Sequence, residues 1–221
     1  NDNITYWNTK NVTDMTYMFC DAESFNQYLD WNTSKVTNMS SMFWDAKSFN
    51  QPINFNTENV TNMFGMFSNA KSFNQLLNLK TENVADMSDM FYDVESFNQP
   101  LNFNTKKVKN IAGMFSHAKS FNQTLNFNTK NVTDMSSMFC YAKLFSQPLN
   151  FNTENVTDMQ GMFKNAESFN KPLNFNTTKV TNMESMFFEA KSFNQPLNFT
   201  NTEKVTNMTK MFYRAISFNQ P

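Results

Sequence analysis

The sequence has few of the residues on which catalytic, metal and disulfide sites usually depend. Its 221 residues include three glycines, two cysteines and one histidine. Two cysteines are too few for a disulfide framework, so stability has to come from packing. The lone histidine, His117, is interpreted as an exposed loop residue. We assign no catalytic, cofactor-binding or metal-binding residue and predict that the protein is not an enzyme.

Excess charge of either sign and long apolar runs are also missing. Eighteen basic and nineteen acidic side chains leave a formal charge of −1, which argues against nucleic acid as a partner because phosphate affinity depends on clustered Lys and Arg. No apolar stretch approaches the ~20 residues that span a bilayer. The chain opens Asn1-Asp2-Asn3 without an initiator Met or a signal-peptide core, so we expect it to be a segment of a longer protein.

What the sequence does have is an internal repeat of 24 residues in nine copies, with abundant Phe, Met and Asn. Large apolar residues recur at this interval: Trp7, Trp31, Phe55, Leu79, Phe103, Phe127, Phe151, Phe175 and Phe199. A valine row behaves likewise, with one residue inserted near Thr200: Val12, Val36, Val60, Val84, Val108, Val132, Val156, Val180 and Val205. Self-similarity of this period indicates a solenoid.

Within each repeat, the first half has the apolar spacing of an amphipathic helix. Val12, Met15, Met18, Phe19 and Ala22 lie at i, i+3, i+6, i+7 and i+10, which places them in an arc of about 120° on a helix. The second half alternates apolar and polar residues, as in a short strand. The sequence therefore predicts an α/β solenoid of nine coils, each with one short helix and one short strand. Stacking of the coils buries the rows, so residues 1–221 form one domain.

The repeat resembles that of a known bacterial family. Residues 132–149 read Val-Thr-Asp-Met-Ser-Ser-Met-Phe-Cys-Tyr-Ala-Lys-Leu-Phe-Ser-Gln-Pro-Leu, which is similar to the repeat of the mycoplasma- and listeria-type bacterial surface lipoproteins. The spacing Met-Phe-x-x-Ala-x-x-Phe is also similar to the core of BspA-like leucine-rich repeats. The resemblance implies a leucine-rich-repeat-like solenoid outside the cell, with adhesion or partner binding as its role. No lipobox cysteine or cell-wall anchor lies in these residues, so surface attachment is implied by the resemblance alone.

Three regular rows have structural interpretations. Met-x-x-Met pairs could bind Cu(I), but Ile111 replaces one methionine, so core packing is favoured. Asparagines at one slot are expected to form a hydrogen-bonded ladder: Asn54, Asn78, Asn102, Asn126, Asn150, Asn174 and Asn198. A threonine row is regular enough to suggest an ice-binding face, which we do not favour because each coil has only one such Thr: Thr9, Thr33, Thr57, Thr81, Thr105 and Thr129.

Variation between coils points to the recognition surface. The slot after the core Phe contains Cys20, Trp44, Ser68, Tyr92, Ser116, Cys140, Lys164, Phe188 and Tyr213. On a helix this slot would face outward, so its aromatic residues should be exposed, and the two cysteines, five coils apart, cannot form a disulfide. Exposed aromatic residues are typical of partner surfaces, although drift at a tolerant position could also produce them. The predicted partner-binding residues are Tyr17, Trp44, Phe64, Tyr92, Phe188 and Tyr213.

These observations favour a secreted or surface-displayed interaction solenoid that binds a protein or a host or cell-surface ligand. The alternative is a structural fibre or coat protein whose solenoids stack end to end. The expected location in either case is extracellular or on the cell surface.

Overall fold

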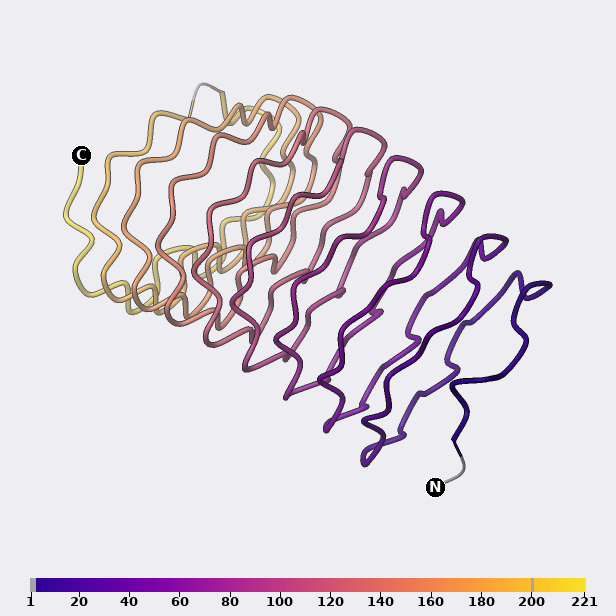
Figure 1. Cartoon of the computed structure of the whole chain (residues 1–221). Coiled ribbons are helices and arrows are strands. Elements are labelled where there is room, and N and C mark those ends of the chain that lie inside the picture. Colours follow the sequence, from indigo (N-terminus) through magenta and orange to yellow (C-terminus); the bar gives the residue numbers. More distant parts are fainter. Residues whose placement is uncertain (1–2, 200) are drawn as a thin grey trace.

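The computed structural model describes residues 3–199 and 201–221 as a stack of coils in chain order. The colours in Figure 1 run from indigo at one end of the stack to yellow at the other, and the two termini lie at opposite ends. Each coil contacts the coils directly before and after it. The predicted repeat solenoid is therefore confirmed, while its internal structure differs from the prediction.

The described residues contain no helix, so the predicted helix in each coil is wrong. Consecutive turns replace it: in the first coil the Met18 N–H donates to Met15 O (3.3 Å) and the Ala22 N–H to Phe19 O (3.1 Å). Between these bonds, alternate N–H groups donate to the next coil, as Phe19 N does to Met42 O (2.8 Å). A helix would keep all of these donors within its own turn. Turns of three-residue span place the same apolar residues inward as a helix would.

The turns require two left-handed backbone positions in each coil, four residues apart. Their φ angles lie between 51° and 61°, as the third residue of such turns requires. Gly, Asp, Asn and Ser occupy many of these positions, and Gly and Asx tolerate this region best. The first position contains Tyr17, Ser41, Gly65, Asp89, Gly113, Ser137, Gly161, Ser185 and Lys210; the second contains Asp21, Asp45, Asn69, Asp93, His117, Tyr141, Asn165, Glu189 and Arg214.

The predicted strands are reduced to isolated parallel bridges between neighbouring coils. In one row of bridges, the residue that precedes the first core Met of a coil pairs with its equivalent in the next coil, as in Asp14↔Asn38 and Asn38↔Asn62. A second row joins leucine-type residues, as in Leu29↔Ile53. The bridge Asn182↔Asn207 spans 25 residues instead of 24, so the ninth coil keeps its pairing despite the inserted residue. Thr200, near which the insertion was predicted, lies outside the described residues.

The core is a continuous set of rows, as predicted, and includes the Val, Met, Phe, Ala and Leu positions of the interior coils. Two columns of phenylalanine rings run along the axis. Phe43 and Phe67, one coil apart, stack at 5.7 Å, and Phe43 stacks on Phe49 of its own coil at 4.1 Å. Met42 and Ile111 are both buried, which agrees with packing as the role of the methionine rows. In the first and ninth coils, Met18 and Met208 are exposed.

The amide ladder exists, but in a different row from the one predicted. Asn102 and the other members of the predicted row are exposed. The asparagine after the second core Phe forms the ladder: Asn98 Oδ1 accepts the Asn122 N–H (2.9 Å) and Gln123 Nε2 (3.1 Å) from the next coil. The row of acceptors is Asn26, Asn50, Asn74, Asn98, Asn122, Asn170 and Asn194.

The threonine row turns inward and satisfies backbone carbonyls. Thr33 Oγ1 donates to Asn56 O (3.0 Å) and Thr105 Oγ1 to Asn128 O (3.1 Å), each in the following coil. Both side chains are buried. This row therefore holds neighbouring coils together and presents no face to ice or to a partner.

Candidate functional site

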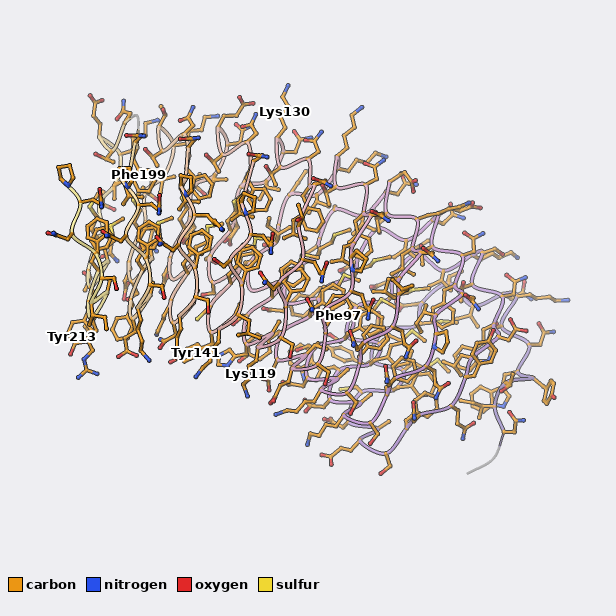
Figure 2. All side chains as sticks on the ribbon, turned by 60° about the vertical axis from the view of Figure 1, so that its left-hand side comes forward. Phe97, Lys119, Lys130, Tyr141, Phe199 and Tyr213 are labelled. Atoms are coloured by element: carbon orange, nitrogen blue, oxygen red, sulfur yellow. The ribbon has the colours of Figure 1, made fainter. Side chains whose placement is uncertain are left out.

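The surface with the greatest variation between coils lies along the turns. We use "turn edge" for the slot after the core Phe together with the left-handed residue that follows it, from Cys20-Asp21 in the first coil to Tyr213-Arg214 in the ninth. In Figure 2 the labelled Tyr141 and Tyr213 both lie on the lower side of the stack, whereas Lys130 lies on the opposite side. The turns set the direction of these side chains, since most inward positions of the coil are occupied by apolar rows that repeat from coil to coil.

The predicted partner-binding residues differ in exposure. Tyr17 is 56 % exposed and Tyr213 is 46 % exposed. Trp44, Tyr92 and Phe188 are half-buried, so the prediction of full exposure is wrong for them. The cause is the stacking of coils, since each ring packs against side chains one coil away.

Phe64 is likewise half-buried, and the structure groups the aromatic residues into separate pairs. The ring centroids of Trp44 and Phe64 are 6.1 Å apart. Phe188 stacks on Tyr213 at 5.0 Å, and Lys164 Nζ lies 5.2 Å from the centroid of the Phe188 ring. The Phe188 and Tyr213 rings are stacked, whereas the Trp44 and Phe64 rings are tilted by 45° to each other.

The middle of the turn edge contains a cluster that the sequence did not predict. His117 is half-buried, not a free loop residue. Its ring stacks on Tyr141 with centroids 4.5 Å apart and lies 5.5 Å from the Tyr92 centroid. The sequence did contain a sign of this cluster. His117 and Tyr141 occupy the same slot in adjacent coils, one residue after the aromatic slot. The cluster presents two phenol groups and one imidazole along about two coil spacings.

The state of His117 should make stability depend on pH. Burial is the main cause that lowers the pKa of His117 below its usual value of 6.5, and the Asp93 carboxylate opposes it. The folded chain therefore binds a proton at His117 less readily than the unfolded chain does. The free energy of unfolding that neutral His117 contributes is fully present above pH 6.5 and is lost as the pH falls through the folded pKa. We expect the urea midpoint to fall between pH 7.5 and pH 5 by more in the native chain than in His117→Asn. Asn69 and Asn165 fill the same left-handed slot, so this variant should fold; equal pH dependence of the two proteins would contradict the assignment.

A ladder of charges runs beside the turn edge. Glu95 Oε1 lies 3.0 Å from Lys71 Nζ and 3.1 Å from Lys119 Nζ, in the coils on either side. Glu167 bridges Lys143 and Lys191 in the same way, at 3.1 Å and 3.3 Å. These pairs are partly exposed, so each contributes little stability, but the alternation neutralises the charge along this side of the solenoid.

The two cysteines occupy the turn-edge slot and form no disulfide with each other, as predicted. Cys20 is half-buried, whereas Cys140 is buried, which corrects its predicted outward position. Burial raises the pKa of the Cys140 thiol to about 11. A thiol with so high a pKa is a poor nucleophile at neutral pH, so Cys140 has a packing role.

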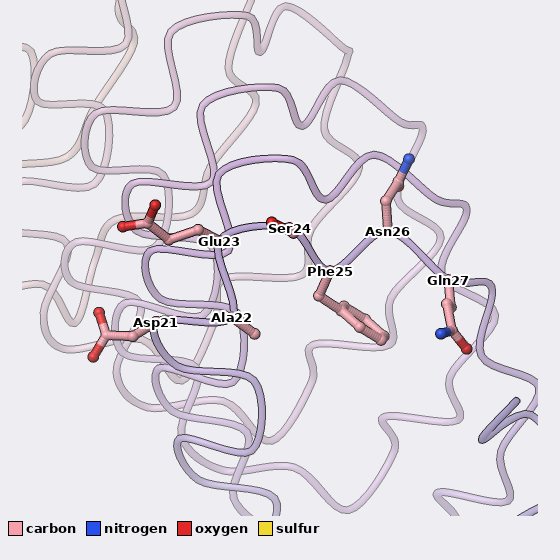
Figure 3. A pocket seen from close by; sticks show the side chains of 7 residues that line it. All are labelled: Asp21, Ala22, Glu23, Ser24, Phe25, Asn26 and Gln27. Atoms are coloured by element: carbon pink, nitrogen blue, oxygen red, sulfur yellow. The ribbon is translucent and has the colours of Figure 1, made fainter. Parts of the chain in front are cut away.

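One hollow, of about 660 Å³, lies on the first coil and is lined by seven consecutive residues, Asp21 to Gln27 (Figure 3). Ala22 and Phe25 are half-buried there, whereas Ala46 and Phe49, their equivalents one coil later, are fully buried. The same surface in interior coils is thus covered by a neighbouring coil. The hollow follows from the stacking of coils and does not gather residues from different parts of the chain, as a catalytic pocket does.

Two further observations concern metals and membranes. Among residues 3–199 and 201–221, no three side chains of His, Cys, Asp or Glu are grouped so that they could hold a metal ion. In the same part of the chain, no helix is long and apolar enough to cross a bilayer.

A family model described as "Mycoplasma protein of unknown function, DUF285" matches the chain four times. The matches cover residues 1–79, 53–149, 76–173 and 125–221 and together span the whole sequence. The chain belongs to this family. Neither the curated proteins nor the solved structures that were searched gave a match. The overlapping matches agree with the uninterrupted stack of coils, because one DUF285 unit corresponds to about four of them.

In this DUF285 chain, the structure brings only some of the predicted site residues together. Trp44 meets Phe64, and Phe188 meets Tyr213, but these two pairs lie several coils apart. Tyr92 lies between them with His117. Tyr17 lies in the first coil, at the first left-handed position instead of the aromatic slot. The six residues thus form one discontinuous line along the solenoid, without a shared pocket.

Proposed function

We propose that this chain is a non-catalytic interaction solenoid, displayed outside the cell or on its surface, that binds a protein or cell-surface partner along the turn edge. The observation that carries the proposal is the contrast between rows. Core and ladder positions repeat nearly the same residue from coil to coil, whereas the turn edge changes from Trp44 to Lys164 to Phe188. A partner can distinguish one part of a solenoid from another only where neighbouring coils differ.

The surface chemistry of the turn edge supports this role. Tyr and Trp are enriched where binding energy concentrates, because they combine a large apolar area with a polar group. Tyr213 is exposed, and the half-buried Trp44 ring packs against Phe64 of the next coil. Pre-ordered side chains lose less entropy when a partner binds. The resemblance to bacterial surface lipoproteins supports the extracellular location and the BspA-like adhesive role.

The test is a set of substitutions along the turn edge. Replacing Trp44, Tyr92, Phe188 and Tyr213 together by Ser should reduce saturable binding of the fluorescently labelled chain to cultured epithelial cells at least about tenfold, since hot-spot truncations cost ~2 kcal/mol or more. Ser68 and Ser116 occupy the same slot in other coils, so the variant should remain folded, as circular dichroism would show.

The matched control lies in another exposed row, outside the turn edge. Asn102 and Asn126 are exposed, and replacing both by Ala should leave binding within about twofold, as expected for surface positions outside the contact. Undiminished binding of the folded serine variant, or loss of binding in the alanine control alone, would overturn the proposal.

A further inference from the structure

A cluster of lysines lies away from the turn edge, in coils five and six. With coils counted in steps of 24 from Trp7, these are residues 103–126 and 127–150. Lys106, Lys107, Lys109 and Lys130 are all exposed. None of them forms an ion pair within residues 3–199 and 201–221. In Figure 2, Lys130 lies on the side of the stack opposite Tyr141 and Lys119. The near-zero net charge of the chain therefore conceals one local concentration of positive charge.

This cluster borders a shallow hollow that is formed where two outward rows change. The row of exposed threonines, which includes Thr61 and Thr133, is interrupted by Ala85 and Lys109. The small Ala85 leaves a depression, and Lys109 adds a charge beside it. The hollow has a volume of about 640 Å³, and its lining is Asn83, Ala85, Lys107, Lys109, Asn131 and Thr133.

Hydrogen bonds to neighbouring coils hold the polar groups around the hollow. Lys107 Nζ donates to Asn83 Oδ1 at 2.6 Å, which draws the ammonium group toward coil four and leaves it with two free N–H groups. Asn131 Nδ2 donates to Lys106 O at 2.8 Å. Lys109 Nζ makes no hydrogen bond to any described residue. Lys107 and Lys109 thus both line one hollow, and their ammonium groups have N–H donors available for a ligand.

Acidic residues limit the extent of the positive surface along the axis. Glu82 precedes Lys106 and Glu154 follows Lys130 in the same row of coils. Asp86 and Asp134, in the row next to Lys109, direct their carboxylates to the N–H groups of their own turns, at 2.8 Å in each case. The favourable region for an anion therefore covers about two coil spacings, or ~10 Å. A ligand that fits this region is small and highly charged.

We propose that this hollow is a binding site for a compact, multivalent phosphate group, held by Lys107 and Lys109 with Lys106 and Lys130 as the surrounding positive field. Its volume is within the range of small-ligand sites. Lysine is a common partner of phosphate as a point charge. The lining contains no aromatic ring, and because single-stranded nucleic acid is held largely by base stacking, an isolated phosphate group fits better than a polynucleotide.

The decisive variant uses residues that other coils already contain. Lys107→Asn with Lys109→Thr recreates the Asn and Thr found at these slots in coil six, as Asn131 and Thr133, so the variant should fold. Isothermal titration with sodium tripolyphosphate should show binding to the native chain that weakens with added salt. In the variant, affinity should drop at least about tenfold, the effect of losing one charged hydrogen bond.

The control removes the same charge from the same row elsewhere. Lys35→Asn with Lys179→Asn deletes two lysines at the slot of Lys107, in coils without a lysine at the slot of Lys109. Tripolyphosphate affinity should stay within about twofold, since a distant exposed charge is largely screened. Equal weakening in the two double variants would show that net charge alone attracts the anion, and absence of binding to the native chain would also overturn the proposal.

A second arm identifies the source of the phosphate. The native chain and the Lys107→Asn, Lys109→Thr variant are mixed with phosphatidylcholine vesicles with and without phosphatidic acid, whose headgroup is a phosphate monoester. Sedimentation of the native chain alone with the anionic vesicles would support a lipid headgroup. Tripolyphosphate binding without sedimentation would support a free or polymer-borne phosphate.

Discussion

Replacing Phe115 by Ala is expected to destabilise the folded chain by about 3–5 kcal/mol, the usual cost of removing a buried phenylalanine. Phe115 is fully buried and stacks on three rings: Phe91 at 5.6 Å, Phe121 at 4.0 Å and Phe139 at 5.8 Å. The cavity would lie between coils four and six, where main-chain ladders hold the coils too firmly to collapse onto it. Urea denaturation followed by circular dichroism measures the loss.

The control for this substitution is the equivalent residue in the ninth coil. Phe212 is half-buried and stacks on Phe187 and Phe218, so Phe212→Ala should cost clearly less, because its site is already partly open to water. Similar midpoints for Phe115→Ala and Phe212→Ala would contradict the view that the interior ring columns dominate stability.

Replacing Gly113 by Ala is expected to cost about 2–5 kcal/mol, from a left-handed backbone position and from overpacking together. Gly113 has a φ of 61°, and a Cβ atom there would overlap the carboxylate of Asp89 in the preceding coil. That carboxylate is half-buried, and desolvation is the main cause that raises the pKa of Asp89, so the Asp89 side chain has to rotate away from the added methyl group. Thermal and urea midpoints of the variant give the cost.

Gly161 separates the two contributions. Its φ is 58°, and a Cβ atom there would meet Ser137 Oγ at 3.4 Å, an ordinary contact. Gly161→Ala should therefore lose only the backbone term of about 1–2 kcal/mol. Adding Asp89→Gly to Gly113→Ala should recover most of the difference, because Gly occupies the same slot in other coils. If the double variant were no more stable than Gly113→Ala, the clash with Asp89 would not be the cause.

The repeat period and the core rows could be predicted from the sequence, whereas the backbone conformation could not. The spacing of Met15, Met18, Phe19 and Ala22 satisfies a helix, and it equally satisfies consecutive turns that share the same inward positions. A signal against the helix was present in the polar slots. Gly65 and Asn69, four residues apart, are poor helix formers that tolerate positive φ, and most coils carry similar residues there. The apolar pattern fixes which side chains are buried but not where the main-chain N–H groups find their acceptors.

The asparagine and aromatic rows show the same distinction at the candidate site. Regularity indicated an amide ladder, yet Asn98 forms it and Asn102 does not, because only the former turns toward the next coil. The aromatic slot was identified correctly as variable, while its exposure was overestimated, since rings in adjacent coils cover one another. The Lys107 and Lys109 hollow was missed because it depends on Ala85, one coil earlier in the chain.

Residues that are hydrogen-bonded between neighbouring coils lie about one repeat apart in the sequence throughout the stack. Inter-coil bonds such as Phe19 N to Met42 O and Asn122 N to Asn98 Oδ1 join residues 23 or 24 positions apart. Each coil therefore closes a loop of the same length, about a tenth of the chain, and the entropy of closure does not grow as coils are added. Gain or loss of a whole repeat leaves every remaining loop unchanged. A gene encoding this protein can thus gain or lose repeats by unequal exchange and still encode a chain in which each coil closes a loop of the same length.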